Sequence, residues 1–498
     1  MLQQHIQRLT GMKVDKNFIY VPESIYVNSL DGHYLKSKRC YRLPNNPYTW
    51  QQLAQTYHNE QYVQIYRQKM QQLKQLLKLK ELEDTTGDKR LRPYQRVDVE
   101  YIRKIPHVLV ANEMRTGKTP TSLVALKDAE RLLIVVPASI LYKWEEEVKI
   151  WTDFTPLVLD GTKARRKLLW QEWKRPKTAL ILSYGILRND KDVIPKVPFS
   201  MIVDEAHRLA NYKTHQSQAI FEMSRKATQR LALTGTPTQN KGDDIWGILH
   251  YLYPDKFPSY WQFVERYFKL WQPPYRQGLE VVAYKPHRKQ ELQDMVACFS
   301  VQRKRAEVMK WIPKVQHITY DVEMSKKQRK HYDEMLEFYE TEHVDAPNVL
   351  VQSLRLNQIT LDPSLLELDS PSAKEEFILE YLQDNKEPII IFSKFTSYLK
   401  KLSSKLKEQH GLIHGKVDKQ TRFKVADDFQ KGKIRIILAN IVSAGEGLTL
   451  DRASEVIFLD RHYNPAKNDQ AQDRIIPTTE DANQRVTIID IVARDSVD

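Results

Sequence analysis

The stretch VLVANEMRTGKTPT, from Val108 to Thr121, decides how the surrounding chain is expected to fold. It opens with the apolar run 108–110, passes through a short polar segment, and continues into an apolar-periodic segment that ends at Leu126. This order predicts a strand, a tight loop and a helix, which is the context that a phosphate-binding loop requires. The loop N–H groups would face the phosphates, with the positive end of the helix dipole behind them. A basic turn at a helix start is the alternative, because so short a string also arises by chance.

The residues of this loop have the chemistry that nucleotide binding needs. Lys118 is expected to reach the outer phosphates as a point charge, and the Thr119 hydroxyl is expected to ligate magnesium. Arg115, Thr116 and Gly117 precede them and are expected to line the nucleotide. The loop therefore predicts a nucleotide and Mg²⁺ as cofactors.

A carboxylate pair follows a second buried strand. The run 201–203 predicts that strand, and Asp204-Glu205-Ala206-His207 comes directly after it. Sheets of the α/β type bind ligands at the carboxyl ends of their strands. Asp204 is therefore expected to hold magnesium through water, and Glu205 to orient and deprotonate the attacking water.

Further segments of the same region have expected roles. Strands are predicted over 132–137 and 179–183, and a strand and turn over 231–240. The Thr234 and Thr236 hydroxyls of that turn are expected to relay between nucleotide and nucleic acid.

A glutamine precedes the phosphate loop by a short predicted helix. Gln95 ends the string LRPYQ, 91–95, and its amide can hydrogen-bond both the donor and the acceptor edge of adenine. Arg92 of the same string is expected to contribute to nucleotide binding.

Charge indicates a polyanionic partner. The 498 residues carry a net charge of +14, and the first 90 hold nearly half of this excess. A basic excess favours nucleic acid as a partner, with a solvated basic surface as the alternative.

Other features exclude some classes of protein. No apolar run is long enough for a membrane span, so no membrane association is expected. The N-terminal MLQQHIQRLT lacks the apolar core of a signal peptide. A cytoplasmic location is expected, with Cys40 and Cys298 as reduced thiols.

The N-terminal region is expected to be a separate accessory module, residues 1–88. Short alternating runs over 13–50 predict a β-rich fold with a hairpin turn at Asp31-Gly32. Helical spacing predicts one long helix over 60–83, followed by a linker over 84–89. Because the strands of the expected motor lie downstream, removing residues 1–88 is expected to leave a folded remainder.

Basic and aromatic residues interleave in this module, which suits phosphate contacts and base stacking. A small sheet with one solvated face explains the pattern equally well. The residues are Lys36, Lys38, Arg39 and Arg42 with Tyr34, Tyr41 and Tyr48.

The remaining chain predicts a second sheet. Residues 246–343 are read as a helical protrusion, rich in aromatic and basic residues, that belongs to a first lobe over 89–345. Four apolar runs with helices between them predict a second parallel α/β sheet in a lobe over 346–498. These runs are 389–392, 434–439, 455–459 and 486–491. The expected fold class is α/β, with two parallel-sheet lobes, the protrusion and a small β-rich module.

Taken together, nine strings resemble the superfamily-two helicases, and within them the Swi/Snf-type double-stranded-DNA translocases. The resemblance runs over about residues 89–498 and keeps the order of the family's motifs. It implies two RecA-like lobes that clamp ATP and step along one strand of a duplex. The strings are LRPYQ (91–95), ANEMRTGKT (111–119), LLIVVPASILYKWEEE (132–147), DEAH (204–207), LTGTPTQN (233–240), IIIFSKF (389–395), IHGKVDKQTR (413–422), ILANIVSAGEGLTL (437–450) and DRHYNPAKNDQAQDR (460–474).

The resemblance also implies roles for residues of the second lobe. Gln470 and Arg474 would reach across to ATP. Four residues would line the cleft between the lobes and the DNA track, and they are Ser443, Gly445, Glu446 and Gly447.

Three positions depart from the family's pattern. Arg115 stands where the family usually has glycine, a substitution that looks like that of bacterial and phage relatives. Pro477 stands where the family has its final arginine, for which Arg474 is the expected replacement and Arg485 the alternative. The chain ends within 496–498, where relatives begin a helix that braces the lobes, so a shortened chain or an incompletely ordered terminus is expected.

These features lead to an expected function. Residues 17–53 resemble the small module ahead of the motor in annealing helicases and phage branch-migration helicases, which favours DNA recognition. We expect an ATP- and Mg²⁺-dependent translocase that acts as a monomer on duplex, forked or branched DNA. If the chain is phage-encoded, the expected location is the host cytoplasm. A remodeler that displaces proteins from duplex DNA and a slow-switch DNA-binding scaffold are the alternatives.

Overall fold

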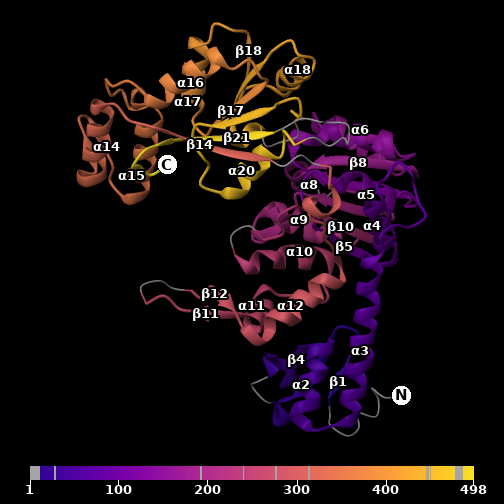
Figure 1. The fold of residues 1–498 in the computed structure, drawn as a ribbon. Coiled ribbons are helices and arrows are strands. Elements are labelled where there is room, and N and C mark those ends of the chain that lie inside the picture. The colour runs from indigo at the N-terminus through magenta and orange to yellow at the C-terminus, as the bar shows by residue number, and fades with distance from the viewer. Residues whose placement is uncertain are drawn as a thin grey trace. The chain divides into compact units, whose positions relative to one another are not determined.

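The chain forms two compact units, residues 1–308 and 309–498, in a computed structural model (Figure 1). Each unit contains a parallel sheet with helices between its strands, which confirms the predicted α/β class with two RecA-like lobes. The residues described are 12–26, 30–190, 193–238, 241–274, 278–311, 315–444, 448, 450–476 and 486–498.

The sheet of the first unit has seven strands, and all neighbouring strands are parallel. Its central strands are apolar and buried, as expected for a sheet that is covered on both faces. In spatial order they are β13 (Ser300–Val301), β5 (His107–Val110), β10 (Gln229–Leu233), β9 (Ser200–Asp204), β6 (Arg131–Val136), β8 (Thr178–Ser183) and β7 (Thr155–Val158).

Helices connect these strands and bury large aromatic side chains against the sheet. Trp144, Trp170 and Trp173 are each at most 2% exposed. The helices are α4 (Pro93–Lys104), α5 (Lys118–Ala125), α6 (Leu141–Trp151), α7 (Lys163–Glu172), α8 (Tyr184–Asp190), α9 (His215–Ser224) and α10 (Ile245–Leu252).

The predicted helical protrusion is shorter than expected and includes a β-hairpin. After α10 the chain forms α11 (Tyr260–Tyr267), the antiparallel strands β11 (Phe268–Trp271) and β12 (Glu280–Tyr284), and α12 (Pro286–Cys298). It then returns to the first sheet as β13 rather than continuing outward to 343.

The N-terminal module contains the predicted β-rich part as a four-stranded antiparallel sheet, but it has two helices where one long helix was predicted. The predicted hairpin turn at Asp31-Gly32 is wrong, because the strands before and after it both pair with residues 40–44 and not with each other. Between these strands Glu23–Ile25 forms a 3₁₀ turn. The elements are β1 (Lys13–Val14), β2 (Phe18–Pro22), β4 (Cys40–Pro44) and β3 (His33–Leu35), then α2 (Pro47–Tyr57) and α3 (Glu60–Lys78), which continues as a 3₁₀ turn to Glu81.

Buried charges attach this module to the protrusion. Arg266 of α11 and Arg288 and Glu291 of α12 are at most 4% exposed. Burying a charge is costly unless the charged group is paired. They bind one another, and each also bonds to the module. Arg266 donates to Thr49 Oγ1 at 3.0 Å, and Glu291 accepts from Asn46 Nδ2 at 2.7 Å.

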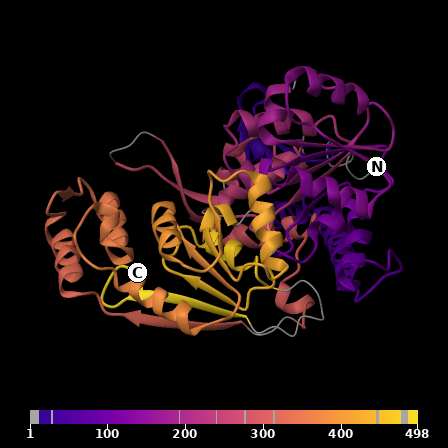
Figure 2. The same cartoon turned by 90° about the horizontal axis from the view of Figure 1, so that it is seen from above.

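The second unit has a six-stranded parallel sheet. Its edge strand β14 pairs along its whole length with β21, the last strand of the chain, and Figure 2 shows β14 outermost beside the yellow β21. In spatial order the strands are β14 (Gln316–Val322), β21 (Thr487–Ala493), β20 (Glu455–Phe458), β17 (Ile389–Ser393), β19 (Ile436–Asn440) and β18 (His410–Ile413).

The pairing of β14 corrects the predicted boundary between the lobes. The units divide between Val308 and Met309, earlier than the expected boundary after residue 345, because β14 belongs to the second sheet. The helices of this unit are α14 (Lys326–Phe338), α15 (Val349–Leu361), α16 (Ala373–Asp384), α17 (Thr396–Lys405), α18 (Lys419–Gln430), α19 (Ile441–Ala444) and α20 (Pro465–Gln472).

The described residues lack two kinds of feature. None of their helices combines the length and apolar character needed to cross a membrane. In the same part of the chain, three or more His, Cys, Asp or Glu side chains nowhere form a group that could hold a metal ion.

Candidate nucleotide site

Three adjacent strands of the first sheet end at the same edge. In the register of β5, β10 and β9, Val110 pairs with Leu233, and Leu233 pairs with Asp204. The loop after β5, the turn after β10 and the carboxylate pair after β9 therefore lie side by side. This register brings the predicted loop and the predicted carboxylates to one site.

Two left-handed residues shape the loop. Gly117 has φ +79°, and a Cβ there would lie 2.1 Å from Gln95 Nε2, so only glycine fits. Arg115 has φ +63°, in the region that glycine favours and other residues adopt at a cost. Arg115 thus replaces the family's glycine in sequence, while its backbone keeps a conformation that glycine favours.

Side chains of α4 fix the loop from behind. The Thr116 carbonyl accepts hydrogen bonds from the Tyr94 hydroxyl at 2.9 Å and from Gln95 Nε2 at 3.0 Å. Gln95 Oε1 in turn accepts from the Arg92 backbone N–H at 2.8 Å. Both ends of the Gln95 amide are thus bonded within the protein, and its contact with adenine stays a prediction.

Lys118 lies at the start of α5 with its ammonium folded over the loop. Its Nζ donates to the carbonyls of Asn112 at 2.9 Å and Glu113 at 3.1 Å. The Thr116 hydroxyl also donates to the Glu113 carbonyl, at 2.7 Å. Thr119 follows as the second residue of α5.

A buried network that the sequence did not indicate supports the loop. Asp98 of α4 is fully buried and accepts from Asn112 Nδ2 at 2.8 Å and from Arg303 Nε at 2.9 Å. Glu113 accepts at Oε2 from the Arg305 N–H at 2.8 Å. Burial raises the pKa of Asp98 despite the opposing charge of Arg303. The segment that leaves the first unit is therefore bonded directly to the phosphate loop.

Asp204 lies at the end of β9 beside an indole donor. Trp144 Nε1 donates to Asp204 Oδ2 at 3.0 Å. Burial and the neighbouring Glu205 together raise the pKa of Asp204 to about 6, although the bond from Trp144 and the charge of Lys118 oppose the shift. Trp144 is a functional candidate that the sequence missed, although its helix follows β6, the strand next to β9.

Glu205 occupies a strained backbone conformation, with φ +52°. The Tyr184 hydroxyl donates to the Asp204 carbonyl at 2.5 Å and to the Glu205 carbonyl at 3.2 Å. His207 Nδ1 lies 3.2 Å from both Glu205 Oε2 and Thr234 Oγ1. Glu205 is thereby connected through His207 to the turn after β10.

That turn contains the predicted relay threonines. Thr234 is 1% exposed, its N–H donates to the Val110 carbonyl at 3.1 Å, and its hydroxyl accepts from the Thr236 N–H at the same distance. The hydroxyl of Thr234, rather than that of Thr236, is the one bonded toward Glu205. Contacts through His207 therefore connect Thr234 to Glu205, while a contact of Thr234 with nucleic acid stays a prediction.

Two candidate residues of the second unit, Ser443 and Gln470, lie on two helices that pack against each other, and Arg474 follows the second helix. Ser443 is on α19, Gln470 is a buried residue of α20, and the Arg474 carbonyl accepts from the Leu450 N–H at 3.1 Å. Their roles toward ATP and DNA stay predictions. Other predicted positions lie outside the described residues, namely Gly445, Glu446, Gly447, Pro477 and Arg485.

The basic residues of the N-terminal module do not share one environment. Lys36 and Lys38 form a 3₁₀ turn, and Arg39 follows with φ +48°, 3.7 Å from the carboxylate of Glu23. Arg42 lies instead on β4, stacked 4.5 Å from the Phe18 ring centroid.

The aromatic residues differ in the same way. Tyr41 stacks on Tyr26 with ring centroids 3.4 Å apart and also contacts Tyr34. Tyr48 binds Asp294 of α12. The three predicted tyrosines therefore do not form a common base-stacking surface.

Two protein-family models match the chain, and together they cover most of it. The SNF2-related domain model matches residues 48–368, and the helicase conserved C-terminal domain model matches residues 373–476. The Sulfolobus solfataricus SWI2/SNF2 ATPase core, solved in complex with dsDNA, is 25% identical. That match covers 82% of this chain and 89% of the other, with a TM-score of 0.41.

Two curated relatives are similar over most of this chain. An uncharacterised ATP-dependent helicase of Mycoplasma genitalium is 26% identical over 77% of this chain and 38% of its own length. The DNA annealing helicase and endonuclease ZRANB3 of Mus musculus is 25% identical over 77% of this chain and 37% of its own length. The chain spans less than two fifths of either relative. Because the SNF2-related model covers more than half of it, the chain belongs to the SNF2-related family of ATP-dependent helicases.

Proposed function

We propose that this protein is an ATP-dependent DNA translocase that remodels forked or branched DNA by branch migration, fork reversal or annealing. The observation that carries the proposal is the register of β5, β10 and β9, which aligns the loop of Lys118 with Asp204 and Glu205. The family supports ATP use, and the similarity to a DNA annealing helicase supports the choice of branched substrates.

The side chains at this edge fit a nucleotide with magnesium. Gly117 adopts the left-handed backbone conformation of the loop, Lys118 supplies a cation, and Thr119 and Asp204 supply the oxygen ligands that Mg²⁺ prefers. A bound Mg²⁺ would neutralise charge that develops on the transferring phosphate. We assign phosphate binding to Lys118, and magnesium binding to Thr119 and Asp204.

Glu205 is the proposed base for the attacking water. Its backbone strain and its contacts with Tyr184 and His207 hold the carboxylate in one position, which suits proton abstraction at a fixed geometry. The path from His207 to Thr234 then provides a way for bound DNA to act on Glu205. Gln470 and Arg474 are proposed to complete the site from the second unit.

The DNA is proposed to contact Ser443 and Thr234 in the motor and the basic residues of the N-terminal module. The net charge of +14 supports a polyanionic partner. In the module these residues are Lys36, Lys38, Arg39 and Arg42. The monomeric state and the cytoplasmic location rest on the sequence and stay predictions.

One experiment tests this function. ATP turnover is measured with Mg²⁺ in the presence of single strands, plain duplex, forks and four-way junctions, for the parent and for Glu205→Gln. We expect the highest stimulation by forks or junctions. Glu205→Gln should bind nucleotide normally and lose turnover, because it keeps the magnesium ligands and removes the base.

The other outcomes identify the competing functions. Equal stimulation by plain duplex and by junctions would support a remodeler that displaces proteins. A parent with no DNA-stimulated turnover would support a DNA-binding scaffold. Normal turnover by Glu205→Gln would overturn the assignment of the base.

A further inference from the structure

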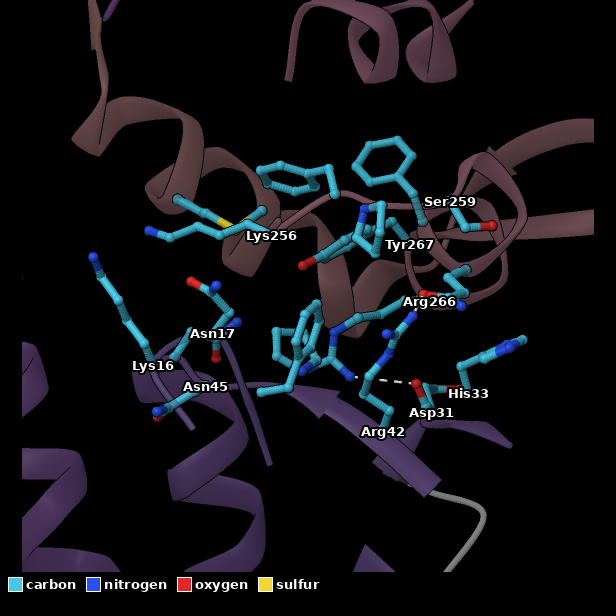
Figure 3. Close-up of a pocket in the computed structure, with 18 residues that line it drawn as sticks. Lys16, Asn17, Asp31, His33, Arg42, Asn45, Lys256, Ser259, Arg266 and Tyr267 are labelled. Atoms are coloured by element: carbon cyan, nitrogen blue, oxygen red, sulfur yellow. Dashed lines mark hydrogen bonds between the residues drawn. The ribbon is translucent and has the colours of Figure 1, made fainter. Parts of the chain in front are cut away.

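A cavity of about 140 Å³ lies where the N-terminal module meets α11, α12 and the segment before α11. Figure 3 shows it between the strands of the module and the segment that leads into α11. Its lining combines cations, amides and aromatic rings from both sides, including Lys16, Asn17, Phe18, Arg42, Lys256 and Phe257. Arg42, predicted from the sequence to contact DNA, is thus part of this cavity.

Two lysines from separate segments line this cavity without a carboxylate partner among the described residues. Lys16 and Lys256 line it, and their ammonium ends extend toward the same side in Figure 3. Lys69 of α3 adds its charge nearby. Among the described residues no side-chain hydrogen bond or ion pair involves Lys16, Lys69 or Lys256, and the Lys256 ammonium lies 4.9 Å from the centroid of the Tyr253 ring.

The charge of the cavity is uncompensated. Burial lowers the pKa of Lys256 below its usual value, and the charges of Lys16 and Lys69 lower it further. Among the described residues that line the cavity, Asp31 is the one carboxylate, and it already binds Lys285, His287 and Arg288 at 2.9 to 3.0 Å. A bound anion would relieve the mutual repulsion of the lysines.

We propose that this cavity binds a phosphodiester group of the DNA backbone, held by Lys16 and Lys256, and that it extends the DNA path from the module to the motor. The inference rests on the proposed function for the identity of its ligand. Lysine suits the task because it acts on phosphate as a point charge. Because the cavity is lined by residues of both parts, one bound phosphate would contact the module and the protrusion together.

The test compares paired variants of the full chain on a fork. Lys16→Gln/Lys256→Gln removes the proposed contact, and Lys16→Arg/Lys256→Arg keeps the charge. Lys127→Gln/Lys149→Gln is the matched control, since it removes two exposed lysines elsewhere in the same unit. Affinity for the fork is measured over a range of salt concentrations, and melting temperature is measured without DNA.

We expect the Gln pair to weaken fork binding about tenfold at low salt. The slope of log affinity against log salt should fall by about 1 for each lost phosphate contact. The melting temperature should stay equal or rise, because like charges that repel one another are removed. The Arg pair should bind like the parent, and the control pair should change the slope less than the Gln pair.

Inorganic phosphate distinguishes the source of the anion. If phosphate alone raises the melting temperature of the parent but not of the Gln pair, while fork binding is unchanged, the cavity is a small-anion site and the DNA assignment is overturned. An equal loss of slope in the control pair, or a lowered melting temperature with an unchanged slope, overturns it as well. A parent with no DNA-stimulated turnover would defeat the proposed translocase, yet the slopes would still decide whether the cavity holds DNA.

Discussion

Asp31 Oδ2 lies 3.0 Å from Nε of Arg288, and this contact joins the N-terminal module to the protrusion of the first unit. Arg288 is 1% exposed, so its charge would be costly to bury without this carboxylate and Glu291. Lys285 and His287 bind the same carboxylate from the start of α12. A single aspartate of the module thus neutralises charge at the base of the protrusion.

This contact predicts a pH dependence of stability. The bonds from His287, Lys285 and Arg288 lower the pKa of Asp31 from 3.8 to about 2, although burial opposes the shift. Because the folded-state pKa is depressed, the stabilisation is fully present above about pH 4 and is lost as pH falls through about 2. We expect Asp31→Asn to cost about 2 kcal/mol of unfolding free energy at pH 7 and almost nothing near pH 2.

Denaturant unfolding at pH 7, 4 and 2 checks this prediction. Asp369→Asn is the control, because Asp369 is almost fully exposed in its pair with Lys327. A deficit for Asp31→Asn that persisted unchanged at pH 2 would show that shape, and not charge, explains the cost.

Deletion of residues 1–88 is now expected to destabilise the first unit, contrary to the expectation from sequence. The cut would leave Arg266, Arg288 and Glu291 without their partners in the module. It would also remove Leu76 and Leu79, which pack on the core of the first sheet. Thermal melting of the deleted chain should begin well below that of the full chain. If the deleted chain and the full chain melted at the same temperature, the module would not stabilise the first unit, as the sequence led us to expect.

The left-handed backbone at Arg115 predicts an asymmetric response to substitution. Arg115→Gly should change the unfolding free energy by less than about 1 kcal/mol, because glycine adopts φ +63° without strain. Arg115→Val should destabilise by about 1–2 kcal/mol, since a β-branched residue fits this region poorly. Denaturant unfolding compares the two, and equal stabilities would remove the strain argument.

Thr234 is predicted to couple DNA to hydrolysis. Thr234→Val keeps the shape of the side chain but removes the hydroxyl that contacts His207 and the Thr236 N–H. We expect DNA stimulation of ATP turnover to fall at least about tenfold, which is roughly 1.4 kcal/mol of transition-state stabilisation. Thr234→Ser should restore it. If the serine variant fails like the valine variant, packing rather than the hydroxyl is responsible.

Arg474 is predicted to replace the arginine that is absent at position 477. Arg474→Ala should lower DNA-stimulated turnover about a hundredfold, or roughly 2.7 kcal/mol, with little change in melting. Arg452→Ala is a structural control in the same unit, because Arg452 NH1 bonds to the carbonyls of Phe429 and Ile434. It should lower the melting temperature instead. Normal hydrolysis by Arg474→Ala, with loss in Arg485→Ala, would assign the role to Arg485.

Apolar strands could be predicted from the sequence, whereas edge strands could not. The buried strands β6, β9, β17 and β20 lie within a residue or two of their predicted positions, because continuous apolar runs mark strands covered on both faces. Strand β14 was missed because its sequence, QHITYDV, mixes exposed polar residues with apolar ones. That miss placed the boundary between the lobes too late.

The candidate site divides in the same way. The loop, Asp204 and Glu205 could be predicted because local sequence order alone places them at strand ends. The partners that position them come from other elements, as when Trp144 reaches Asp204 from 60 residues away. The pairing of Asp31 with Arg288 spans 257 positions, and no periodicity connects residues so far apart.

The pairing of β14 with β21 affects how the protein is made. Among the described strands β14 has no other neighbour than β21, so its backbone groups stay unpaired until residues 487–493 have left the ribosome. At about 5–20 residues per second, this wait lasts roughly 10–30 seconds. During that time the nascent second unit exposes an unpaired strand edge, which is the kind of surface that holding chaperones bind and that neighbouring nascent chains can join.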